Sequence, residues 1–421
     1  METKPLVPRL RFPEFRDAPE WKERMLCEIL HEHGLRSDGQ SEVHSVSVHK
    51  GIINQVEHLG RSFAASDTAQ YNLVKPHDVV YTKSPTGDFP YGIVKQSKLV
   101  HPGIVSPLYG VFTPESEHMG YILDAHFESP TRTNNYLAPI TQKGAKNTIQ
   151  ISNATFLSRG LLLPSDPAEQ RKIAECLMSL DQLIAAAGRE LDALRAHKKG
   201  MMRNLLPREG ETTPRLRFSE FHSAGEWPTR PLSEIAEVKL GKMLDARKHT
   251  SGQLLPYVNN IAVRWGEVDT TNLPQMYFNA NELERYGLRD GDVLVCEGGE
   301  PGRSAVWDGR LPELKFQKAV HRVRFRIPYK PPLLVLYLEA LSGTIAFERL
   351  FTGGGIRHLT GETFARLAVP VPPIQEQSRI ASCLGALDAL ITAQVDKLNS
   401  LKFHKRGLMQ ALFPSPEENH E

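Results

Sequence analysis

Two stretches of the chain carry the same seven-residue pattern of apolar side chains, and this pattern restricts the possible folds more than any other feature. Residues 169–207 (EQRKIAECLMSLDQLIAAAGRELDALRAHKKGMMRNLLP) align with residues 376–414 (EQSRIASCLGALDALITAQVDKLNSLKFHKRGLMQALFP). In both copies apolar residues recur at alternating spacings of four and three, which predicts two long coiled-coil helices. The predicted seam comprises Ile173, Leu177, Leu180, Ile184, Leu191, Leu194, Ile380, Leu384, Leu387, Ile391, Leu398 and Leu401.

A single helix of this kind would expose its apolar stripe, so we expect the two helices to pack on each other. The alternative is that each helix only covers the core of its own domain. Lys198 and Lys405 occupy the same seam position in the two copies. Such a lysine either sets register and antiparallel orientation or marks a frayed, solvent-exposed end, and the sequence favours the frayed end.

A second repeat lies ahead of each helix. PRLRFPEFRDAPEW (8–21) returns as PRLRFSEFHSAGEW (214–227), with ten of fourteen positions identical. Between the repeats, residues 30–160 and 236–365 share almost no sequence that can be aligned. The two copies begin 206 residues apart, at residues 8 and 214. This period is far longer than that of solenoid repeats, so the chain is predicted to be a duplication with pseudo-two-fold symmetry. Each half combines a common frame with a divergent insert.

Both inserts have the composition of mixed α/β domains with short strands. Their β-branched runs are interrupted by proline and glycine. Each contains a turn that leads into Asp-Val-aliphatic, at Asp78-Val79-Val80 and at Asp292-Val293-Leu294. We therefore expect the two inserts to share a fold that carries two different surfaces.

Basic segments without acidic residues are the candidates for contact with nucleic acid. LKFQKAVHRVRFRIPYK (314–330) holds six Lys or Arg, and strand alternation predicts an exposed face of Arg322, Arg324 and Arg326. Such a face suits a phosphate backbone, although a solvated edge strand uses charge in the same way to prevent aggregation. TQKGAKNTIQ (141–150) is also acid-free, and it either reaches base edges with its amides and hydroxyls or forms a polar surface loop.

Composition excludes several other classes of protein. The net charge is only +2, so a basic surface has to be local. No run of 18 apolar residues and no apolar leader is present, which predicts a cytoplasmic location. The four cysteines form no C-x-x-C pair, which argues against a zinc site or a disulfide framework. No P-loop, G-x-S-x-G or H-E-x-x-H motif occurs, so no catalytic site or metal site is predicted.

This organisation resembles the specificity subunit of type I restriction-modification systems. The resemblance rests on the duplicated proline-rich entry to a long helix (PSDPAEQRKI at 164–173 and PVPPIQEQSRI at 370–380), the repeated Arg-Phe-x-Glu-Phe…Glu-Trp opening, and the two divergent inserts. It covers nearly the whole chain. The first entry departs slightly from the pattern, with Ser165-Asp166 where the second copy has Pro373-Ile374, which is a difference in a loop.

The resemblance implies an α+β fold, with two α/β target recognition domains in pseudo-two-fold arrangement joined by two long antiparallel coiled-coil helices. Residues 1–163 and 208–369 would be the recognition domains, and residues 164–207 and 370–421 the conserved helices. Each domain would recognise one half of a bipartite DNA sequence, with the helices setting the gap. Two methyltransferase subunits would supply S-adenosylmethionine chemistry on adenine, and motor-nuclease subunits would use ATP and Mg²⁺. The chain itself would be non-catalytic and bind no cofactor or metal.

Candidate DNA-contacting residues are polar or basic side chains in the inserts, where arginine and lysine hold phosphates or guanine and amides recognise adenine. They are Lys83, Ser84, Arg132, Lys143, Lys146, Asn147, Arg264, Arg303, Gln317, Lys318, Arg322, Arg324, Arg357 and His358. Two alternative functions remain open from the sequence. One is a coiled-coil adaptor whose inserts bind protein. The other is the specificity part of a fused restriction-methyltransferase enzyme.

Overall fold

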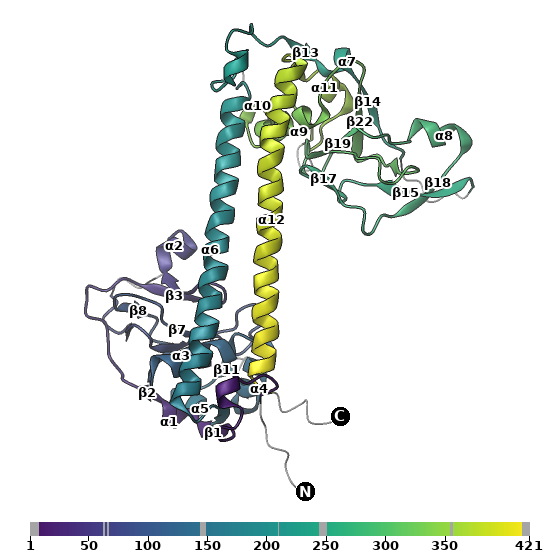
Figure 1. Cartoon of the computed structure of the whole chain (residues 1–421). Helices are drawn as coiled ribbons and strands as arrows, with labels where there is room; N and C mark the ends of the chain where they lie inside the picture. The colour runs from purple at the N-terminus through teal and green to yellow at the C-terminus, as the bar shows by residue number, and fades with distance from the viewer. Residues whose placement is uncertain are drawn as a thin grey trace. The chain divides into compact units, whose positions relative to one another are not determined.

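The computed structural model describes the chain except for 1–7, 62–63, 65–66, 144–148, 209, 244–250, 354–356 and 415–421, and it gives only the backbone of residues 142, 143, 149 and 150. The described chain forms two compact units. The first comprises residues 1–188 and 396–421, and the second comprises residues 189–395. Each unit takes in one insert domain and part of both long helices, which are labelled α6 and α12 in Figure 1.

The first unit is a mixed α/β domain. Its elements are η1 (Pro13–Phe15), β1 (Lys22–Met25), α1 (Leu26–Ile29), β2 (Leu30–Glu32), β3 (His44–Ser47), β4 (Gly51–Asn54), α2 (Gln55–Leu59), β5 (Asn72–Val74), β6 (Val79–Tyr81), β7 (Val94–Gln96), β8 (Gly103–Val105), β9 (Gly110–Pro114), α3 (Glu117–Phe127), α4 (Pro130–Leu137), η2 (Ala138–Ile140), β10 (Gln142–Lys143), β11 (Ile149–Gln150), α5 (Asn153–Leu157), β12 (Gly160–Leu163) and the first part of α6 (Pro167–Leu205).

The second unit has a closely similar order of elements. They are η4 (Ser219–Phe221), β13 (Thr229–Pro231), α7 (Leu232–Ile235), β14 (Ala236–Leu240), β15 (Gln253–Val258), β16 (Val263–Arg264), β17 (Glu267–Val268), β18 (Gln275–Phe278), α8 (Ala280–Arg285), β19 (Val293–Cys296), β20 (Ser304–Val306), β21 (Lys315–Phe316), β22 (Val320–Phe325), α9 (Pro331–Leu341), α10 (Ile345–Glu348), α11 (Gly361–Ala365), β23 (Ala368–Pro370) and the first part of α12 (Ile374–Leu412).

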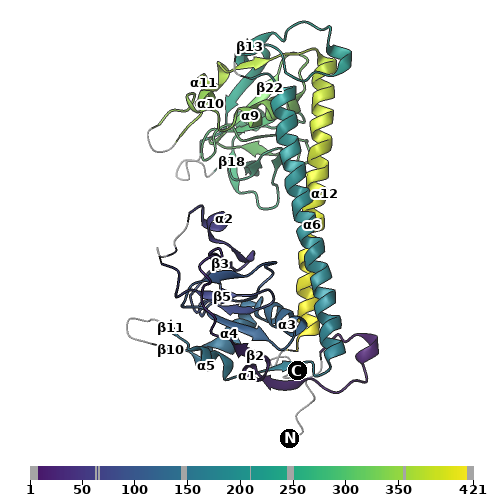
Figure 2. The same ribbon diagram turned by 90° about the vertical axis from the view of Figure 1, so that its left-hand side faces the viewer.

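The central sheets of the two units have the same topology. The first has strand order β2-β9-β6-β7 and the second β14-β22-β19-β20, with every neighbouring pair antiparallel. Each unit also contains a separate two-stranded sheet, which is β1 with β12 in the first unit and β13 with β23 in the second. The helices that follow the sheets are also equivalent: α3 lies beside α6 in the first unit (Figure 2), where the Tyr121 hydroxyl donates a hydrogen bond to Asp181. The expectation that the divergent inserts share a fold is therefore confirmed.

The shared Asp-Val turn explains part of this common topology. Asp78 and Asp292 are each 1% exposed, and each carboxylate accepts a hydrogen bond of 2.7 Å from the backbone N–H three residues earlier. This contact closes the turn that leads into a buried strand. The second partner of the carboxylate differs between the units. Thr113 donates to Asp78 at 2.9 Å, whereas Arg324 donates two hydrogen bonds of 2.7 Å to Asp292.

The repeated opening segment holds the first turn of each long helix. Nε and Nη2 of Arg11 each donate a hydrogen bond of 2.7 Å to the carboxylate of Glu169, and Trp21 Nε1 donates to the same carboxylate at 3.3 Å. Glu169 is 1% exposed and lies near the N-terminus of α6, where a negative charge also interacts favourably with the helix dipole. In the second unit the same contacts are made by Arg217, Trp227 and Glu376.

Segments of α6 and α12 pack against each other in antiparallel orientation within each unit. In the first unit Ile173 and Leu177 share a core with Met409 and Leu412, and in the second unit Met202 and Leu205 share a core with Ile380 and Leu384. All twelve predicted seam residues are buried or half-buried. By contrast, the off-seam leucines 183 and 390 are 53% and 55% exposed. The predicted seam residues thus lie on the covered side of each helix, and the helix ends enter the domain cores.

The seam lysines are not frayed ends, so the interpretation that the sequence favoured is wrong. Lys405 is 9% exposed, and its Nζ lies 2.6 Å from Glu128 and 2.8 Å from Asp181. Lys198 has an equivalent pair of partners in the second unit, Glu339 at 3.0 Å and Asp388 at 2.8 Å. Lys405 on α12 thus bridges Asp181 on α6 and Glu128 at the end of α3. Lys198 on α6 bridges Asp388 on α12 and Glu339 on α9. A cation with partners on both sides specifies one register, as buried polar seam residues do.

Candidate nucleic-acid interface

Three loops of the second unit meet at one edge of its central sheet. Because the strands are antiparallel, the ends of β14 and β19 and the start of β22 lie at the same edge. Backbone hydrogen bonds join the loops to one another. Glu297 N donates to Ala319 O at 2.8 Å, Leu359 N donates to Glu297 O at 2.8 Å, and Lys318 N donates to Lys242 O at 2.7 Å. The side chains on these loops are therefore held by a fixed backbone.

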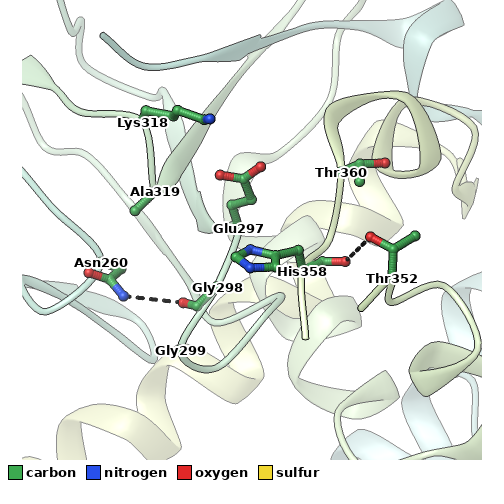
Figure 3. Close-up of a pocket in the computed structure, with 9 residues that line it drawn as sticks. All are labelled: Asn260, Glu297, Gly298, Gly299, Lys318, Ala319, Thr352, His358 and Thr360. Carbon is green, nitrogen blue, oxygen red and sulfur yellow. Dashed lines mark hydrogen bonds between the residues drawn. The ribbon is translucent and has the colours of Figure 1, made fainter. Parts of the chain in front are cut away.

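These loops surround an open hollow of about 540 Å3. It is lined by Asn260, Glu297, Gly298, Gly299, Lys318, Ala319, Thr352, His358 and Thr360 (Figure 3). Asn260 Nδ2 donates to Gly298 O at 3.3 Å and ties a further loop to the edge. Gly299 has a φ of +80°, and a Cβ there would lie 2.9 Å from Asn260 Nδ2, so the tight turn requires glycine.

Several predicted residues of the second unit are brought together at this edge. Lys318 and His358 line the hollow, and Gln317 precedes Lys318 in the same loop. Arg303 is half-buried, donates to Asn260 O at 2.7 Å and pairs with Glu300 at 2.9 Å, so it helps to build the edge. Arg357 is exposed in the chain next to His358 and forms an ion pair with Glu348.

Arg264 lies on strand β16 and is not among the residues that line the hollow. Its side chain is 62% exposed and lies 3.5 Å from Asp269. Such an exposed ion pair contributes little to stability. Its guanidinium group is therefore able to exchange that carboxylate for a phosphate at small cost.

The prediction of an exposed arginine face on β22 is wrong for Arg322. That residue is only 2% exposed and lies 3.0 Å from Glu237. Burial lowers its pKa, and the neighbouring charge of Arg324 lowers it further. Arg324 is half-buried and holds Asp292, which raises its pKa. Period-two alternation located the strand, but it did not show that acidic groups cover this face.

In the first unit, Lys83 and Ser84 occupy the loop after β6, at the edge equivalent to the loop after β19. Lys83 has a φ of 56°, which is rare for a residue with a side chain and fixes the backbone at the entrance to this loop. Burial lowers its pKa, and the carboxylate of Glu32 opposes that shift. Both residues are therefore placed where the corresponding domain has its hollow.

The other predicted residues of the first unit are placed differently. Arg132 donates to the carbonyl oxygens of Met409 and Phe413, so it contacts the C-terminal end of α12 rather than the loop edge. Lys143 lies on the short strand β10, for which only the backbone is described. Lys146 and Asn147 lie outside the described residues.

Sequence inspection missed Glu297 and Asn260. The carboxylate of Glu297 stands beside a glycine pair (CEGGE, 296–300) and so lies outside the acid-free segments. Glu297 could have been found because it is a polar residue directly after the buried strand β19. Residues at strand ends present their side chains at the edge of the sheet.

The described part of the chain contains no group of three or more His, Cys, Asp or Glu side chains that could hold a metal ion. Within the same residues, no helix has the length and apolarity needed to cross a membrane. What the loop edge offers is charged and hydrogen-bonding side chains on an open surface. This arrangement is suited to binding a large polar ligand.

The sequence comparisons agree with this description. Residues 224–402 match the family described as the type I restriction modification DNA specificity domain. The MjaVIII specificity subunit of Methanocaldococcus jannaschii is 24% identical over 263 residues, covering 59% of this chain and 60% of that protein. The EcoKI specificity subunit of Escherichia coli K12 is 24% identical over 366 residues, covering 81% of this chain and 75% of that protein. The first of these relatives is thus matched over less than two thirds of its length.

Solved structures share the fold. The S subunit of a type I restriction-modification system from M. genitalium superposes with a TM-score of 0.59 at 14% identity, over 97% of this chain and 99% of that one. A chain from a structure of type I R-M complex assembly gives 0.54 at 17% identity, over 94% and 98%. This chain therefore shares the fold of these solved chains. Its sequence is similar to type I restriction enzyme specificity subunits, and the match to the DNA specificity domain covers residues 224–402.

Proposed function

We propose that this chain is the sequence-reading subunit of a type I restriction-modification complex, in which each domain recognises one half of a bipartite, asymmetric DNA site. The observation that carries the proposal is that two domains with the same strand order present different side chains at equivalent loop edges. Lys83 and Ser84 lie at the first edge, whereas Glu297, Lys318 and His358 lie at the second. Different groups on a common scaffold select different bases.

The proposal assigns two kinds of contact to these domains. Exposed basic side chains such as Arg264 and Arg357 would hold phosphates and fix the position of each domain on the duplex. Side chains at the loop edges would contact base edges in the major groove, which alone distinguishes all four base pairs. The coiled coil would set the unread gap between the half-sites. Each helix of 39 residues is about 58 Å long at about 1.5 Å per residue.

The duplicated frame supports a symmetric set of partners. The Arg-Glu-Trp contacts and the seam lysines occur once in each unit, so two identical partner subunits would find two equivalent surfaces. We propose that these are methyltransferase subunits that bind S-adenosylmethionine and modify adenine, joined by motor-nuclease subunits that use ATP and Mg²⁺. This chain would be non-catalytic and would bind none of these cofactors. Since the ligand is chromosomal DNA, the complex would work in the cytoplasm.

The proposal is tested by sequencing methylated adenines across the genome of cells that carry this chain with the methyltransferase of its system, and of matched cells in which the chain is deleted. The expected result is one methylated motif of two short, different half-sites separated by a constant gap. This motif should disappear on deletion. Adenine methylation that does not depend on the chain, or that occurs at a single continuous motif, would contradict the proposal.

A further inference from the structure

We propose that the loop edge of the second unit recognises a G·C base pair, with Lys318 donating to guanine and Glu297 accepting from cytosine. This inference rests on the proposed function and specifies part of the site that the second domain recognises. Figure 3 shows that the Glu297 carboxylate and the Lys318 ammonium both border the hollow, from two neighbouring loops.

Both charges are available to a ligand. Glu297 and Lys318 are half-buried, and neither side chain forms a hydrogen bond or ion pair with any other residue that the structure describes. Most other charged side chains near this edge are engaged, including Arg303 with Glu300 and Lys242 with Glu282. An acid and a base that border one hollow without pairing leave all their hydrogen-bonding capacity for a ligand.

Both groups are also held in place by the backbone. Ala319 directly follows Lys318, and its carbonyl oxygen accepts a hydrogen bond of 2.8 Å from the backbone N–H of Glu297. This hydrogen bond connects the two loops. The carbonyl of Glu297 accepts from Leu359 N at 2.8 Å, next to His358. Little backbone freedom remains to be lost on binding, which favours a group that selects its ligand by geometry.

The chemistry of the two side chains fits a G·C pair. Lysine has three donors and no acceptor, and an ionised glutamate only accepts. In the major groove guanine presents two acceptors, N7 and O6, while its partner cytosine presents the N4 amino donor. Lysine to guanine and glutamate to cytosine are the favoured contacts of these side chains. A G·C pair places two adjacent acceptors beside one donor, whereas an A·T pair places its donor between two acceptors. His358 borders the same hollow and would contact a neighbouring group.

The test compares genome-wide adenine methylation in cells that carry the wild-type chain with its methyltransferase, or one of the variants Glu297→Ala, Glu297→Gln and Lys318→Ala. In the wild type we expect one half-site to contain an invariant G·C pair. Each variant should raise methylation of other base pairs at that position about tenfold or more relative to G·C, in line with the discrimination of one good side-chain contact. Glu297→Gln should admit adenine in place of cytosine, since glutamine pairs with adenine.

The other half-site is the internal control, because its recognition should be unchanged in all three variants. Glu313→Gln removes an exposed carboxylate in the same unit and should leave the whole motif unaltered. If methylation persists and no position relaxes in the Glu297 and Lys318 variants, or if the position that relaxes is an A·T pair in the wild type, the G·C assignment is overturned while the proposed function stands. If the wild type shows no bipartite motif, both are overturned.

Discussion

Replacing Lys405, the buried seam lysine of the first unit, tests whether its ion pairs hold the two long helices together. Lys405→Met keeps the length and apolar stem of the side chain but removes the ammonium group that contacts Glu128 and Asp181 at 2.6 and 2.8 Å. Both carboxylates then lose their cation. Among the described residues, Asp181 then keeps its hydrogen bond from the Tyr121 hydroxyl and a more distant lysine, Lys98, at 3.8 Å.

The expected loss of stability follows from the burial of the three groups. Breaking a fully buried ion pair by removing one partner costs about 3 to 5 kcal/mol. The side chains of Glu128 and Asp181 are 41% and 28% exposed, so water replaces part of the lost interaction. We therefore expect Lys405→Met to lower the free energy of unfolding by about 2 to 3 kcal/mol.

The pH dependence of this contribution has a defined sign. Burial alone would lower the pKa of Lys405, but the two carboxylates outweigh it and raise the pKa above the usual 10.5. Burial would raise the pKa of Asp181, but Lys405 and Tyr121 outweigh it and lower the pKa below the usual 3.8. The stabilisation is thus complete between these two usual values, and it is lost as pH rises through the raised pKa or falls through the lowered one.

Urea unfolding followed by circular dichroism measures the effect at pH 7, with the exposed Lys402→Met as the matched control. The triple variant Lys405→Met, Asp181→Asn, Glu128→Gln should recover most of the lost stability, because it leaves no unpaired buried charge and keeps an acceptor for the Tyr121 hydroxyl. If Lys405→Met destabilises the protein no more than Lys402→Met, the cluster does not hold the helices as we describe.

Two further predictions concern the arginines of β22 and the length of the long helices. Arg324→Met should lower the free energy of unfolding by about 3 kcal/mol because it leaves the 1% exposed Asp292 without its cation, whereas the salt dependence of DNA binding by the complex should not change. Adding one heptad at facing positions of α6 and α12 lengthens the pair by about 10 Å at about 1.5 Å per residue, so the gap in the methylated motif should grow by about 3 base pairs.

Patterns within the sequence predicted the parts of the fold that repeat. The seam residues were predicted because an apolar stripe of spacing four and three favours packing on another helix. The shared topology of the inserts was predicted from a single turn, because Asp78 and Asp292 close the same backbone hydrogen bond ahead of a buried strand. Both features are local, or periodic along one element.

Features that depend on tertiary partners were not predictable in this way. Arg322 has the spacing of an exposed strand residue, yet Glu237 on the neighbouring strand covers it. Lys198 and Lys405 looked like helix ends because their carboxylate partners are distant in sequence. Glu297 became a candidate only when the fold placed its loop beside Lys318. In each case the decisive neighbour belongs to another element of the chain.

The most direct measurement of the central claim is the methylated motif of a chimera in which residues 236–365 are replaced by the corresponding insert of a relative with a different target. The frame contacts of Arg217, Trp227 and Glu376 lie outside the exchanged segment and would be kept. If each domain recognises one half of the site, one half of the motif changes to that of the donor and the other half remains the same. A motif that changes in both halves, or in neither, would contradict the account.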